Sequence, residues 1–152
     1  MGAPIPTEEL NKVDFLLGDW TGEESMMGQK STSKTHSEWA LGGRYVRTNV
    51  TYQMGPAAPP VEGMHMLTYD PDKKVYTAWW YDSAAPNVMS MKGNFEGDKL
   101  VLISDPTPMP NMPDAIFRST WWKKGDKGLG FTLDIKEGDK WITMVDGDYK
   151  KN

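Results

Sequence analysis

The chain has 152 residues, which suits one compact domain that needs no disulfide or metal for its stability. Its 17 Lys and Arg residues against 21 Asp and Glu residues give a formal net charge of −4 without a long run of either sign, which argues against a nucleic-acid partner. The absence of cysteine excludes thiol nucleophiles and zinc–thiolate sites, and no apolar run is long enough to span a bilayer.

The N-terminal residues lack the basic start and apolar centre of a signal peptide. We therefore expect a soluble protein without membrane insertion, located in the cytoplasm or exported and already freed of its signal peptide. Residues 1–6 are interpreted as a tail, and residues 7–150 as a single domain.

One helix is predicted, over residues 7–17. Thr7 can cap it, and Glu8 and Glu9 suit the positive end of the helix dipole. Four apolar residues share one helical face: Leu10, Val13, Leu16 and Leu17. Gly18 is a typical C-terminal cap and is followed by Trp20, which begins the first strand.

From Trp20 onward the apolar residues recur with a period of two, which is typical of β-strands. Ten strands are predicted, over residues 20–27, 33–40, 44–54, 61–69, 74–82, 88–95, 99–104, 115–123, 129–136 and 140–149. Gly-Asp turns at 97–98, 125–126 and 138–139 indicate tight hairpins. The proline-rich segment 105–113 is interpreted as an ordered crossing loop or a lid.

This order of elements predicts an all-β fold. Consecutive hairpins without intervening helices exclude a parallel α/β sheet and leave a sandwich or a closed up-and-down antiparallel barrel. The barrel of about ten strands is favoured, because closure pairs the first and last strands and removes the unpaired edges. The N-terminal helix is expected to cap one end.

The Gly18-Asp19-Trp20 step after a short helix resembles the Gly-x-Trp opening of the calycins, which include lipocalins, fatty-acid-binding proteins and nitrobindins. Residues 39–44, 68–70, 76–83 and 140–144 further resemble a bacterial family of lipocalin-like barrel domains that has no established activity. The resemblance spans about residues 7–150 and implies that Trp20 plugs one end of the barrel. It also implies a glycine where this chain has His65, so that an ionisable ring enters the lumen if that position faces inward.

Trp80 and Asp82 alternate with Tyr76 and Ala78 on one face of a strand. The resemblance implies that this is the face that the members of the family have in common. A carboxylate inside a small barrel needs a partner, and Arg118 is the candidate. It would clamp a ligand carboxylate or orient Asp82. The alternatives are a structural ion pair and an arginine stacked on Trp20.

Methionine is abundant, with 11 residues, and two alternating pairs stand out: Met64 with Met66, and Met89 with Met91. Such pairs can line a cavity with adaptable apolar surface or simply fill the core. The tryptophan doublets at 79–80 and 121–122 each place one ring inside the barrel and one outside. His65 has no neighbouring ligand at metal-binding spacing, and a haem bound as in nitrobindins would need a histidine later in the chain, so no cofactor or metal is expected.

Three functions remain open. The first is the binding of a small, largely apolar molecule, with or without a carboxylate, in the lumen. Its candidate ligand-binding residues are His65, Trp80, Asp82, Met91 and Arg118. The second is an enzyme that uses Asp82 or His65 for acid–base chemistry, although nucleophile elbows, phosphate loops and metal motifs are missing from the sequence. The third is a packed barrel with a structural role, whose outer tryptophans form a homodimer face.

Overall fold

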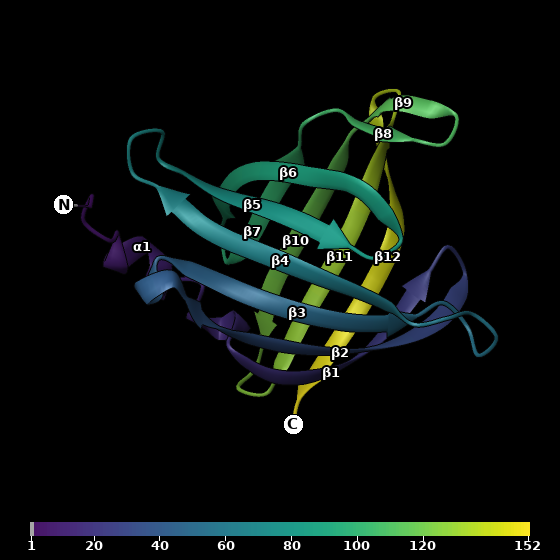
Figure 1. The fold of residues 1–152 in the computed structure, drawn as a ribbon, viewed down its shortest axis with the longest axis horizontal. Coiled ribbons are helices and arrows are strands. Elements are labelled where there is room, and N and C mark those ends of the chain that lie inside the picture. The colour runs from purple at the N-terminus through teal and green to yellow at the C-terminus, as the bar shows by residue number, and fades with distance from the viewer. Residues whose placement is uncertain (1) are drawn as a thin grey trace.

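The computed structural model describes residues 2–152, which form a closed antiparallel barrel of ten strands (Figure 1). The strands of the barrel are β1 (Gly18–Met26), β2 (Gln29–Ala40), β3 (Tyr45–Gln53), β4 (Val61–Asp70), β5 (Val75–Asp82), β6 (Ala85–Glu96), β7 (Lys99–Ser104), β10 (Phe117–Lys124), β11 (Gly128–Glu137) and β12 (Lys140–Lys151). Neighbours in sequence are neighbours in the barrel throughout, except that β7 pairs with β10. The prediction of an all-β up-and-down barrel is confirmed.

The barrel is closed by pairing between the first and last strands. The β1–β12 register runs from Trp20 opposite Lys151 to Met26 opposite Val145. Neither strand is left with an exposed row of unpaired backbone groups, which is the reason that favoured a barrel over a sandwich.

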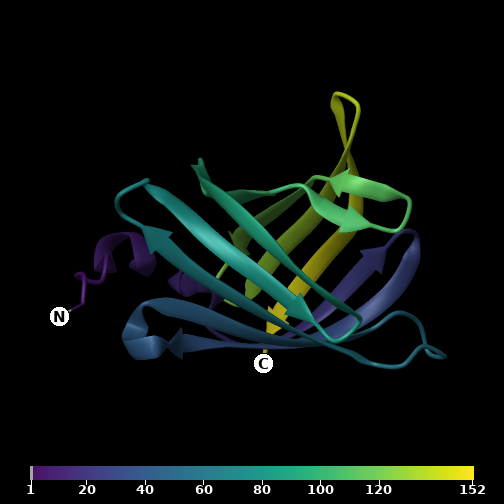
Figure 2. The same cartoon turned by 45° about the horizontal axis from the view of Figure 1, so that its top comes forward.

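The segment between β7 and β10 forms a small sheet of its own. Strands β8 (Thr107–Met109) and β9 (Met112–Ala115) pair with each other and stay outside the barrel ladder. The proline-rich segment is therefore an ordered hairpin. It lies toward the end of the barrel that is opposite α1 (Figures 1 and 2).

The helical segment is shorter than predicted. The α-helix α1 covers Thr7–Asn11, and a 3₁₀ turn, η1 (Asp14–Leu16), follows it; a second 3₁₀ turn, η2 (Leu41–Gly43), joins β2 to β3. Val13 N–H bonds to the Leu10 carbonyl and Leu16 N–H to the Val13 carbonyl, which are the tighter bonds of a 3₁₀ turn. This tightening replaces the predicted continuous helix, yet Leu10, Val13 and Leu16 all remain buried.

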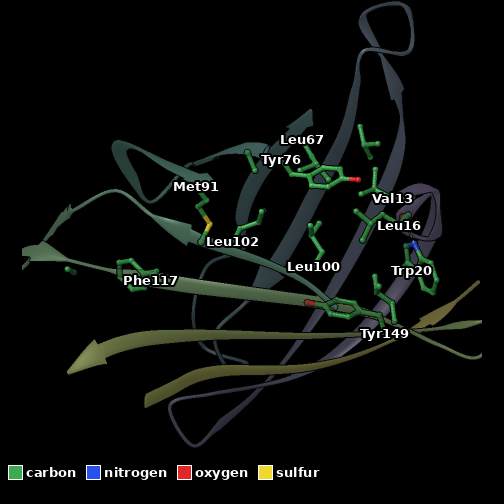
Figure 3. Close-up of a cluster of buried hydrophobic side chains, with 14 residues drawn as sticks. Val13, Leu16, Trp20, Leu67, Tyr76, Met91, Leu100, Leu102, Phe117 and Tyr149 are labelled. Carbon is green, nitrogen blue, oxygen red and sulfur yellow. Dashed lines mark hydrogen bonds between the residues drawn. The ribbon is translucent and has the colours of Figure 1, made fainter. Parts of the chain in front are cut away.

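Trp20 closes the barrel end beneath this segment. Only 2% of its surface is exposed, and its indole Nε1 donates a hydrogen bond to the Leu16 carbonyl at 2.9 Å. The Tyr76 hydroxyl from β5 donates to the Glu9 carbonyl at 2.7 Å and so ties α1 to the opposite wall. Figure 3 shows Val13, Leu16 and Trp20 gathered together in the buried cluster.

The opposite end of the barrel is formed by the β1–β2, β3–β4 and β5–β6 turns, because successive strands run alternately toward and away from α1. We call this end the mouth. No helix among residues 2–152 is both long and apolar enough to cross a membrane.

Candidate ligand-binding cavity

A cavity of about 410 Å³ lies inside the barrel. Its wall is mostly apolar, and seven of the eleven methionines line it: Met26, Met27, Met54, Met89, Met91, Met109 and Met144. The predicted Met89 and Met91 pair thus faces the cavity, with Met91 almost fully buried. Met64 and Met66 are not part of the wall, because His65 takes the inward position between them.

Aromatic rings form much of the remaining wall. Trp80 and Trp121 line the cavity, whereas their neighbours Trp79 and Trp122 do not, so each doublet has one ring on each face as predicted. Trp121 packs on Phe131 with 4.0 Å between ring centroids, and its ring is 6.3 Å from that of Tyr149. This aromatic cluster makes the deeper wall a firm apolar surface.

His65 faces the cavity from β4. It is directly opposite Trp80 of β5, and its ring centroid is 6.3 Å from that of Trp121, which belongs to the far wall. The protein encloses the imidazole while part of its surface borders the open cavity. Burial lowers the pKa of His65 to about 4, so the ring is neutral at neutral pH and able both to donate and to accept a hydrogen bond.

The side chains of Trp80 and Asp82 are hydrogen-bonded to each other. The Trp80 Nε1 donates to Asp82 Oδ2 at 2.9 Å, and Asp82 Oδ1 accepts from the backbone N–H groups of Ala84 and Ala85 at 2.9 and 3.1 Å. Gly63 lies directly opposite Asp82 and leaves room for the indole, since a Cβ there would clash with the Trp80 ring. Asp82 is thus stabilised by its own turn and by Trp80.

Arg118 is on the outside of the barrel, so the prediction that it faces the lumen and pairs with Asp82 is wrong. Its Nε and Nη2 donate to Asp134 Oδ2 at 2.9 and 2.7 Å, and its guanidinium lies 4.6 Å from the centre of the Trp141 ring. The reason is strand alternation: Phe117, Ser119 and Trp121 occupy the inward positions of β10. The structural ion pair, which was the alternative, is what the fold contains.

A second carboxylate reaches the cavity that the sequence did not single out. Glu24 of β1 lines the wall, is only 8% exposed and forms no ion pair with any residue between 2 and 152. Its carboxylate lies beside the Tyr149 hydroxyl; burial, followed by the charge of Glu24, raises the pKa of Tyr149 well above its ordinary value. The signal in the sequence is its place in the alternation Trp20, Gly22, Glu24.

The charged side chains of the wall are all acidic. Glu24 and Asp82 line the cavity, and no Lys or Arg of the described chain does. Tyr52 stands near both acids: burial first, and then the charges of Asp82 and Glu24, raise the pKa of its hydroxyl. Ser119, which is 4% exposed, has no hydrogen-bond partner for its hydroxyl in the part of the chain that the structure describes. The wall thus combines apolar surface with a few polar groups that can still accept a partner.

Comparison with known proteins places the chain in a family. The model of a family described as "Protein of unknown function (DUF1579)" matches residues 6–151. The chain belongs to the DUF1579 family. No curated protein matches it.

A solved structure shares the fold of this DUF1579 protein. The crystal structure of Rv2717c from M. tuberculosis superposes with a TM-score of 0.66 over 95% of this chain and 97% of that one, at 10% sequence identity. Identity this low establishes a common barrel architecture and nothing about function. The function of the DUF1579 protein therefore follows from the chemistry of its own cavity and not from this resemblance.

Proposed function

We propose that this DUF1579 protein binds a small, largely apolar molecule inside its barrel, as a calycin-like binding protein. The observation that carries the proposal is the cavity of about 410 Å³ in the interior of an otherwise closed barrel. Sites for small molecules commonly enclose roughly 300 to 1,000 Å³, with mostly apolar walls and a few convergent polar groups. His65, Trp80 and Met91 line this cavity and remain candidate ligand contacts.

The abundance of methionine in the wall supports a cavity that accepts apolar ligands of different shapes. Thioether side chains are flexible and polarisable, so a wall made from them adapts to different apolar surfaces. An apolar ligand in the cavity would also gain dispersion contacts with this wall.

The proposal predicts that a substitution inside the barrel blocks binding while its neighbour outside does not. Val50 lines the cavity, whereas Thr51 is the next residue on β3 and is exposed. Val50→Trp should weaken the binding of phenylnaphthylamine, a neutral fluorescent probe, by at least about tenfold, because the indole would occupy the cavity. Thr51→Trp adds the same ring on the outer surface and should leave the affinity unchanged.

The measurement is a fluorescence titration of the probe, excited beyond the absorption of tryptophan. Fatty acids, retinoids and tetrapyrroles then serve as competitors, and quenching of the emission of Trp80 and Trp121 provides a second readout. Absence of probe binding together with absence of quenching by any of these molecules would contradict the proposed function. Equal binding by both variants would place the probe outside the cavity.

A further inference from the structure

The charge of the cavity restricts the class of ligand. Its wall contains the carboxylates of Glu24 and Asp82 and, within residues 2–152, no Lys or Arg side chain. Arg118, the one cation expected to balance Asp82, is bound to Asp134 on the outer face. An anionic ligand would therefore meet negative charge in a medium of low dielectric constant, where such repulsion is strong.

The two acids differ in how well their neighbours stabilise them. Asp82 accepts hydrogen bonds from the Trp80 indole and from two backbone N–H groups. Glu24 has the neutral Tyr149 hydroxyl beside it and, among the described residues, no cation paired with it, although only 8% of its surface is exposed. A buried carboxylate without an opposite charge is costly, and a cation that reaches it gains a charge-assisted hydrogen bond.

The position of Glu24 also suggests an orientation for the ligand. Glu24 lies two residues before Met26, where β1 ends at the mouth, and Tyr52 and Asp82 are near the mouth ends of β3 and β5. Tyr149 connects this acidic region to the aromatic wall, since its ring is 6.3 Å from Trp121. A ligand with a cationic head at Glu24 would thus place its apolar body against Trp121 and Phe131.

We propose that the cavity selects organic cations, namely hydrophobic amines whose ammonium group pairs with Glu24 while the apolar body fills the deeper cavity. This inference rests on the proposed function and specifies its ligand class. It replaces the expectation of a ligand carboxylate, which depended on an inward Arg118.

The test uses three probes that share a naphthalene ring and differ in the charge of the head group: naphthylmethylammonium, naphthylmethanol and naphthoate. Isothermal titration calorimetry should rank them in that order of affinity. The ammonium should bind at least about tenfold more tightly than the alcohol, because hydrogen bonds between charged partners are worth more than neutral ones.

Two variants with the same change in net charge distinguish an ion pair between the ammonium and Glu24 from a general effect of the protein's negative charge. Glu24→Gln should abolish the advantage of the ammonium over the alcohol. Glu23→Gln, at the exposed neighbouring position on β1, should retain it. Near-ultraviolet circular dichroism checks that both variants are folded.

The outcomes separate failure of this inference from failure of the proposed function. Binding of all three probes with similar affinity, or tightest binding of naphthoate, overturns the inference and leaves the proposed function in place. The inference is likewise overturned if Glu24→Gln keeps the preference for the ammonium or if Glu23→Gln removes it. Failure of all three probes to bind, together with failure of phenylnaphthylamine, contradicts the proposed function itself.

Discussion

The two histidines occupy opposite electrostatic surroundings. His36 is on the outer face of β2, where its Nδ1 lies 2.7 Å from Asp19 Oδ1 and its Nε2 lies 3.5 Å from Glu38 Oε2. Hydrogen bonding to Asp19, and then to Glu38, raises the pKa of His36. His65 is surrounded by the apolar cavity wall, so burial lowers its pKa to about 4.

These shifts predict opposite titrations of the two rings. In a proton NMR titration, His36 should titrate above its ordinary value of 6.5, whereas His65 should stay neutral until the pH approaches about 4. His36→Gln identifies the signal that remains as that of His65. A His65 midpoint near 6.5 would show that water or a charge stabilises the imidazolium and would contradict the apolar environment.

The same shifts have stability consequences of opposite sign. The pKa of His65 is lower in the folded protein than in the unfolded chain. The contribution of His65 to the free energy of unfolding is therefore complete above pH 6.5 and is lost as the pH falls toward about 4. His65→Gln should flatten this part of the stability curve, which urea unfolding at a series of pH values measures. The raised pKa of His36 stabilises the fold at pH values below 6.5, and that contribution disappears as the pH rises through its folded value.

At the scale of elements, the short helical segment and the first strand form the closed end together. Trp20 connects the two, because its ring is buried under η1 and its indole Nε1 donates a hydrogen bond to the Leu16 carbonyl. Lys151 of β12 extends over the same ring, with its ammonium 5.6 Å from the ring centre. The buried ring and its contacts with Leu16 and Lys151 therefore seal this end of the barrel.

Removal of the Trp20 ring should therefore destabilise the fold strongly. Trp20→Ala should lower the free energy of unfolding by about 3 to 5 kcal/mol, as expected for a fully buried tryptophan. Trp122→Ala is the matched control, because that ring lies on the outer face beneath Lys99 and is only partly buried. Urea unfolding followed by circular dichroism gives both values; equal losses would contradict the role assigned to Trp20.

At the scale of the whole molecule, the barrel depends on contact between the two ends of the chain. Pairing of β1 with β12 joins residues from Trp20 opposite Lys151 to Met26 opposite Val145, and Tyr149 of β12 is 4% exposed in the core. Without this pairing both β1 and β12 would present unpaired edges, which can pair with other chains.

A chain that ends at Asp146 should thus lose its cooperative thermal transition and associate. A chain that ends at Lys151 lacks only Asn152 and keeps the full β1–β12 register, so it should unfold cooperatively as a similar species. Circular dichroism melts and sedimentation velocity distinguish the two. A cooperative, unassociated chain after truncation at Asp146 would show that closure is dispensable.

Sequence alone determined the ten barrel strands, their hairpin order and the place of Trp20 at the closed end, but not the β8–β9 hairpin or the break in the N-terminal helix. The period of two, the glycine turns and the Gly-x-Trp step are local signals, and local signals specify elements well. The face shared by Trp80 and Asp82 was also predictable, because Tyr76 and Ala78 continue the same alternation. His65 and Met91 belong to the same cavity wall in the structure.

Only the tertiary structure decided which face of each strand is inward. On β10 both faces carry large apolar side chains, so Arg118 could be assigned to the lumen until pairing with β7 and β11 fixed the register. The sequence did not predict that Glu24 faces the cavity, because a carboxylate on an alternating strand is usually solvent-facing. Its burial follows from closure of the barrel, which brings β1 beside β12 and Glu24 beside Tyr149.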